Sequence, residues 1–182
     1  MFKTGDPIIH PVRGAGIVVR VEKRTWHGGN GLYYRIELLG QQGISLMVPV
    51  EAAEALGLRR AISRSKVGQV WRVLSAEPDV LPADHKERYE LLREKLYAGD
   101  TLKVAEAVRD MAWRQHREGR LTAVGKRIYE EGITLLAGEI AATQDTQVAD
   151  AETQIRARLT ERMSPDYRDA LLTSRAPDVA AA

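Results

Sequence analysis

The sequence contains no cysteine. This absence excludes disulfide bonds, thiolate metal sites and a thiol nucleophile. Long apolar runs are absent too, because no stretch approaches the roughly 20 residues of a membrane-spanning helix. The opening MFKTGDPIIH also lacks the apolar segment of a secretory signal peptide. We therefore expect a cytoplasmic protein that does not enter a membrane.

Catalytic and metal-binding motifs are missing as well. The four histidines show neither HExxH nor another paired spacing; they are His10, His27, His85 and His116. No G-x-S-x-G elbow, Walker loop or dinucleotide fingerprint occurs. Because a catalytic triad is assembled in space rather than in sequence, an unrelated small enzyme stays a distant alternative. We expect a non-enzymatic protein without cofactor, metal or small-molecule substrate.

Charge is distributed unevenly along the chain. The net charge is only +2, but residues 86–127 carry 11 Lys and Arg against 7 Asp and Glu. Residues 128–182 carry 5 Lys and Arg against 10 Asp and Glu. The basic surplus fits a nucleic-acid surface, and on charge alone it fits a solvated helix surface equally well.

Apolar alternation in the first 60 residues predicts short β-strands. The candidate strands cover 6–10, 17–22, 32–39 and 44–48. Pro49 has no backbone N–H, so the last strand should end there or lie at a sheet edge. Antiparallel strands this short can bury one face only by curling into a small barrel of SH3 or Tudor type.

The segment 26–31, WHGGNG, lies between two of these strands. Its glycines and asparagine tolerate positive φ, and no helix follows to supply free amides, so we predict a hairpin tip rather than a phosphate-binding loop. Trp26 and His27 would lie on this tip. Contact with a partner and packing across the hairpin explain them equally well.

Helical periodicity replaces the alternation after Gly57. The predicted helices run over about 63–75, 84–98, 100–118, 122–140 and 148–163. Trp71 falls on an apolar face, whereas Trp113 falls at the polar edge of its helix. Four basic residues fall off the apolar stripe of the second helix: Lys86, Arg88, Arg93 and Lys95.

The change from strands to helices predicts an α+β chain of two domains. We expect a small β-barrel over residues 1–60, an all-α domain over 61–165 and a flexible tail over 166–182.

Several segments resemble the CarD/CdnL family of bacterial transcription regulators. They are the opening F-K-x-G-D, MVPVEAAEALGLR, RYELLREKLYAGDTLKVAEAVRDM and LTAVGKRIYEEG. The resemblance spans roughly Phe2 to Met163. It implies a Tudor-like domain that binds the β subunit of RNA polymerase carrying the housekeeping σ factor. It also implies a helical domain that contacts promoter DNA weakly, largely without sequence preference, at the upstream edge of the bubble, and so stabilises the open complex.

By position, the resemblance also implies site residues. The expected polymerase-binding residues are Arg24, Met47, Val48 and Pro49. The expected DNA-binding residues are His85, Lys86, Arg88, Arg93 and Lys126. Lysine and arginine contacts to phosphates release counterions without choosing a base, which suits a factor that works at many promoters.

One position departs from the family pattern. Many members have a tryptophan that wedges into the minor groove at the bubble edge, and here the position is His85. An imidazole is smaller and wetter than an indole, so any wedge should be weaker, although His85 can stack on a base or meet a phosphate. This departure and the acidic last third leave a second hypothesis, in which the protein is a polymerase-docking adaptor whose helices bind another protein.

Overall fold

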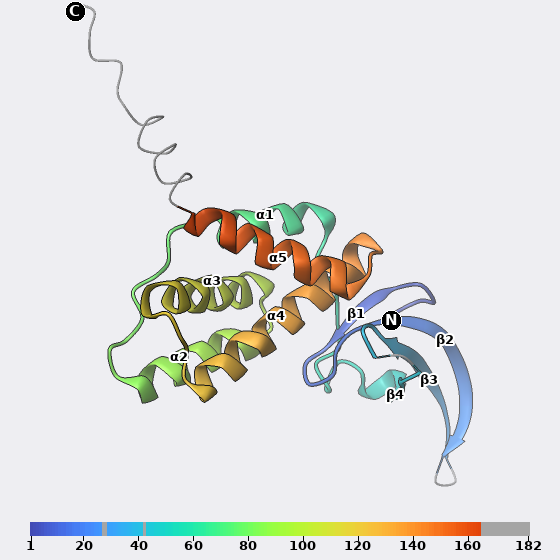
Figure 1. Ribbon diagram of the computed structural model, residues 1–182. Helices are drawn as coiled ribbons and strands as arrows, with labels where there is room; N and C mark the ends of the chain where they lie inside the picture. Colours follow the sequence, from blue (N-terminus) through green and yellow to red (C-terminus); the bar gives the residue numbers. More distant parts are fainter. Residues whose placement is uncertain (27–28, 42, 165–182) are drawn as a thin grey trace, which may run out of the picture.

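The computed structural model describes residues 1–26, 29–41 and 43–164 (Figure 1). An antiparallel sheet comes first and five helices follow it within these ranges, which confirms the predicted α+β class. The strands are β1 (Pro7–His10), β2 (Gly14–Trp26), β3 (Gly29–Leu38), β4 (Ser45–Pro49) and β5 (Arg59–Arg60). The helices are α1 (Arg64–Leu74), α2 (His85–Tyr97), α3 (Thr101–Glu118), α4 (Ala123–Gln144) and α5 (Val148–Met163).

The sheet has the strand order β4-β3-β2-β1-β5. Alternation directs Val18 and Ile36, which are partners across β2 and β3, into one core. Val48 on β4 and Leu58 just before β5 join the same core, so the two ends of the sheet curl toward each other. Pro49 lies on the edge strand β4, as its missing N–H predicts.

The hairpin of β2 and β3 is longer than the sequence suggested. The ladder continues to the pair Trp26 and Gly29, so the glycine-rich segment belongs largely to β3. His27 and the side chain of Trp26 lie outside the described residues, and so does the predicted tail at 166–182. The predicted domain boundaries stay predictions.

Local signals set the helix ends. Asp84 caps α2 by accepting hydrogen bonds from the backbone N–H groups of Lys86 and Glu87. Thr122 caps α4 in the same way, through the N–H of Gly125. Gly119 ends α3 with a φ of 72°, which a residue without Cβ adopts freely.

Helix α3 is central in the helical domain and contacts all four of the other helices. Its apolar face therefore extends around most of its circumference. Trp113 is only 4% exposed, so the expected position at a polar edge is wrong. The sequence pattern of one helix does not show how many neighbours cover it.

Helix α4 joins the two halves of the molecule. Its last turns pack against β1 and β2, while its first turn lies at the opposite end of the helical domain (Figure 1). None of the helices in the described ranges is long and apolar enough to cross a membrane.

Candidate interaction surfaces

The outer face of the sheet carries most of the residues expected to bind polymerase. Arg24, Met47 and Pro49 fall on this face, because side chains on paired strands alternate in phase. Val48 alternates the other way, and its side chain is buried in the barrel core with 4% exposure. Only its backbone on the edge strand is therefore placed to meet a partner.

The structure adds Arg35 to this surface. Arg35 lies directly opposite Met47 in the β3–β4 ladder, and both side chains are exposed. In the described part of the chain, no carboxylate lies within ion-pair distance of Arg35. Arg24, in contrast, is held by Glu22 at 3.0 Å. The alternation along residues 32–39 places Arg35 on the polar face of its strand, and the β3–β4 pairing brings it beside Met47.

Strand β4 is an open edge. Its neighbour in the sheet is β3, and the structure pairs its other side with no described strand. The apolar side chains of Ile44 and Met47 along this edge are 49% and 38% exposed. Unpaired backbone groups beside apolar side chains are the features that a partner strand uses.

A second surface lies where α2 and α4 begin. The hydroxyls of Tyr89 and Thr122 share a hydrogen bond of 2.5 Å, which holds the first turns of the two helices together. His85 and Lys86 on α2 and Lys126 on α4 are exposed around this contact. Arg93 is exposed two turns further along α2, in line with His85 and Tyr89. We call His85, Lys86, Arg93 and Lys126 the basic surface.

His85 is the most exposed ring of this surface. Its side chain is 77% exposed, and its Nδ1 lies 3.9 Å from a carboxylate oxygen of Asp84. The ring meets Tyr89 edge to face, with 6.5 Å between the centroids. Hydrogen bonds from the N–H groups of Glu87 and Lys86 lower the pKa of Asp84, so this cap stays charged beside the histidine.

Arg88 does not belong to the basic surface. It is 4% exposed, and its Nη1 donates to the carbonyl oxygens of Pro82 and Ala83 at 2.8 and 2.9 Å. The expectation that it lies off the buried stripe is wrong, because Arg88, Leu92 and Leu96 follow one another at i, i+4 spacing on the buried face of α2. Arg88 instead fastens the α1–α2 loop to the start of α2.

A polar cavity of about 330 Å³ lies next to Arg88, between α2 and the α3–α4 connection. Arg114 and Arg120 line it together with Glu118, and Arg114 pairs with Glu118 at 2.7 Å. Sequence reasoning did not single out these two arginines. They extend the positive charge from the start of α2 toward the start of α4.

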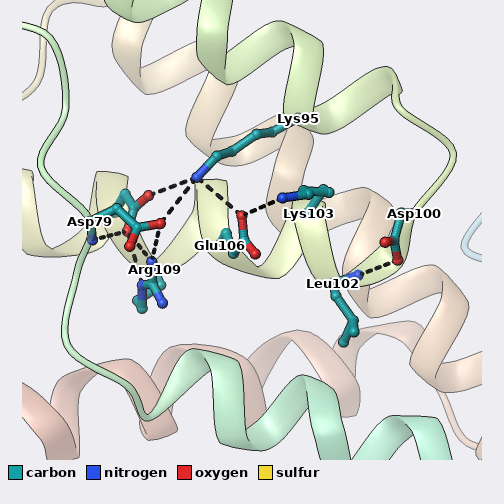
Figure 2. Close-up of polar contacts among 8 residues, drawn as sticks. Asp79, Lys95, Asp100, Leu102, Lys103, Glu106 and Arg109 are labelled. Carbon is teal, nitrogen blue, oxygen red and sulfur yellow. Dashed lines mark hydrogen bonds and ion pairs between the residues drawn. The ribbon is translucent and has the colours of Figure 1, made fainter.

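The loop before α2 is anchored by a cluster of charges that sequence reasoning also missed (Figure 2). The cluster consists of Asp79, Lys95, Glu106, Arg109 and Asp110. The Asp110 carboxylate accepts from Arg109 at 2.7 Å and from the backbone N–H of Asp79 at 3.0 Å, and Lys95 lies 3.3 Å away. Lys95 also meets Glu106 at 3.2 Å.

Opposite charges in this cluster shift its pKa values. Burial opposes the charged form of Lys95, but the carboxylates of Asp110 and Glu106 outweigh it and raise the pKa of Lys95. Burial likewise opposes the charged form of Asp79, and Arg109 and Lys95 outweigh it and lower the pKa of Asp79. Lys95 and Asp79 therefore stay charged near neutral pH, and the cluster fixes the loop that leads to His85.

Within the described ranges, no group of three or more His, Cys, Asp or Glu side chains is placed to hold a metal ion. The polar side chains instead form ion pairs, caps and exposed cationic surfaces. Such an arrangement is suited to binding macromolecules.

Comparisons with known proteins identify a family for each of the two parts of the chain. A family model described as the CarD-like/TRCF RID domain matches residues 2–62, and the model of the CarD C-terminal domain matches residues 69–156. A protein of Bacillus subtilis (strain 168) named putative transcription factor YdeB is 27% identical over 142 residues, which cover 77% of this chain and 90% of that protein. The chain belongs to the CarD-like family of transcription factors, a generally non-enzymatic family that regulates transcription through RNA polymerase.

Proposed function

We propose that the protein bridges the β subunit of RNA polymerase and promoter DNA at the upstream edge of the bubble, and that it thereby stabilises the open complex. The observation that supports this most directly is the placement of two different surfaces. The outer sheet face with its open edge β4 lies in one domain, and the basic surface lies at the far end of the other (Figure 1).

On the polymerase side, we propose that β4 adds to a strand of the β subunit. Main-chain hydrogen bonds would supply affinity, and the side chains of Arg35 and Met47 would supply specificity. Arg24 adds a cation near the hairpin end of the same face. Val48 contributes through its backbone, since its side chain lies in the core.

On the DNA side, Lys86, Arg93 and Lys126 would contact phosphates. Such contacts carry no information about the bases. They weaken as salt rises: the logarithm of the binding constant falls by about 0.9 per phosphate contact for each tenfold increase in salt concentration on double-stranded DNA. His85 stands at the edge of this surface with an exposed ring. It would stack on an unpaired base at the bubble edge and wedge more weakly than an indole.

The DNA side is tested by the double substitution Lys86→Glu and Lys126→Glu. Both side chains are exposed, so the fold should persist. We expect the double variant to bind the isolated β-subunit lobe normally and to lose the lengthening of open-complex lifetime that wild type produces. Arg158→Glu is the matched control, because Arg158 is an exposed arginine on α5 outside the basic surface.

The same assay decides between the two hypotheses. An adaptor whose helices bind another protein would leave the open-complex lifetime unchanged, whether wild type or the double variant is added.

The polymerase side is tested with Met47→Glu and Arg35→Glu, which should abolish binding to the β lobe. Arg13→Glu, an exposed change in the β1–β2 turn, should leave that binding intact.

A further inference from the structure

Glu139 connects the two domains through a single buried carboxylate. It lies in α4 and is 3% exposed. Its Oε1 accepts from Nη1 of Arg59 at 2.6 Å, and its Oε2 accepts from Nη2 of Arg59 at 2.9 Å. The backbone N–H of Ile62 and the hydroxyl of Thr101 donate to the same carboxylate at 3.0 and 2.7 Å. The last strand of the sheet, the interdomain connection, α3 and α4 therefore meet at one group.

Small residues let α4 lie close to the sheet beside this carboxylate. A Cβ placed on Gly138 would lie 3.2 Å from the Cβ of Ala15 on β2. Ala15 and Ala142 form a small buried cluster with Ile9. A larger side chain at any of these positions would push the domains apart or tilt them, unless it is bonded across the contact.

Glu139 is buried and Arg59 is partly exposed in this ion pair. Burying an ionised carboxylate is costly, and apolar residues of similar size often stabilise as much as a buried pair. Its better-attested effect is to select one geometry, because a bidentate arginine–carboxylate pair tolerates little rotation. The junction thus specifies the angle between the sheet and α4.

That angle determines where the basic surface lies relative to the outer sheet face. Lys126 is 13 residues before Glu139 in the same helix, which corresponds to about 20 Å. A rotation of about 10° at the junction would therefore move Lys126 by about 3 Å. A displacement of this size is enough to break a direct phosphate contact.

We propose that Arg59 and Glu139 are positioning residues that hold the polymerase-binding sheet and the DNA-binding helices at one fixed angle, and that stabilisation of the open complex requires this angle. The inference rests on the proposed function. It goes further by assigning a role to two residues that touch neither polymerase nor DNA.

The first test is Glu139→Gln, which keeps the shape of the side chain and removes its charge. We expect the affinities for the isolated β lobe and for duplex DNA to stay within about twofold of wild type. The lengthening of open-complex lifetime should fall by about fivefold or more, the lower end of typical coupling between sites. Arg156→Gln is the control, because Arg156 pairs with Glu130 and Glu152 within the helical domain only.

A covalent rescue distinguishes a fixed angle from simple loss of stability. The chain has no cysteine of its own, so Ala15→Cys and Gly138→Cys can be combined with Glu139→Gln to give one defined disulfide. The two Cβ positions lie 3.2 Å apart, and a disulfide needs about 3.5–4.5 Å, so the helix must shift by only a few tenths of an ångström. The oxidised triple variant should recover the wild-type lifetime, and reduction should remove the recovery.

The outcomes separate this inference from the proposed function. If wild type does not lengthen the lifetime, the bridging function fails and the inference falls with it. If wild type lengthens it and Glu139→Gln does so equally, the positioning role is refuted while bridging stands. The positioning role is also refuted if Glu139→Gln loses either single affinity by more than about fivefold, or if the oxidised disulfide restores nothing.

Discussion

Substituting Asp110 by alanine removes the acceptor that Arg109, Lys95 and the backbone N–H of Asp79 share in the charge cluster that anchors the α1–α2 loop. The Asp110 side chain is 0% exposed, and its two cationic partners, Arg109 and Lys95, are 6% and 12% exposed. The change removes the buried anion that the two cations share, while Asp79 stays close to both and Glu106 stays close to Lys95. It also leaves the backbone N–H of Asp79 without the acceptor it has at 3.0 Å.

Removing one partner of a buried ion pair costs about 3–5 kcal/mol, because an uncompensated charge remains in a poorly solvated site. Asp79 and Glu106 still compensate part of the charge, and the lost hydrogen bond of Asp79 overlaps with this figure. We therefore expect a total near the lower end, about 3 kcal/mol. Total stabilities of domains are about 5–15 kcal/mol. If the free energy of unfolding falls by about 2 kcal/mol per molar urea, the unfolding midpoint should fall by about 1.5 M.

Urea denaturation followed by tryptophan fluorescence measures this midpoint, since Trp71 and Trp113 lie in the helical domain. Glu118→Ala is the matched control, because it breaks the half-exposed Arg114–Glu118 pair and should cost less than about 0.5 kcal/mol. A loss below 1 kcal/mol for Asp110→Ala would falsify the reasoning, because the cations would then be paired or solvated in some other way.

Three further predictions test other parts of the molecule. Gly132→Ala should destabilise the protein by about 1–3 kcal/mol, because the new Cβ would lie 2.8 Å from Cγ2 of Val108. Gly68→Ala is the control: it lies on the open face of α1 and should stabilise the protein by about 0.5–1 kcal/mol. Thermal unfolding of the two variants compares these effects. The pKa of Asp79 is lowered from 3.8 in the folded state, so its contribution to stability is present above pH 3.8 and is lost as the pH falls through the folded pKa. The protection of residues 76–83 from hydrogen exchange, relative to the unfolded chain at the same pH, should be lost there before that of the helices, and simultaneous loss in both would contradict this. His85→Trp should lengthen open-complex lifetime beyond wild type while leaving binding to the β lobe unchanged, and an equal or shorter lifetime would show that the ring at this position does not act as a wedge.

Much of the secondary structure follows from local signals in the sequence. Alternation predicts the strands, Pro49 predicts an edge, and Asp84 and Thr122 predict helix starts, because each of these effects acts within a few residues. The fold class and the family follow from these signals and from the longer motifs. The polymerase-binding and DNA-binding roles of individual residues stay predictions that the experiments above address.

Tertiary structure alone decided which charged residues are exposed and can bind a partner. Arg88 and Lys86 are neighbours in a basic segment, yet Arg88 is buried and Lys86 is exposed, because a loop folds over only one side of α2. In the sequence, Glu139 does not differ from other glutamates of the helices. Its role depends on its contact with Arg59, which lies 80 residues earlier in the chain. Burial and pairing depend on segments far away in the chain, so no local pattern contains them. The sequence by itself determined the elements and their ends, and the packing between them determined the charged surfaces and the angle that separates them.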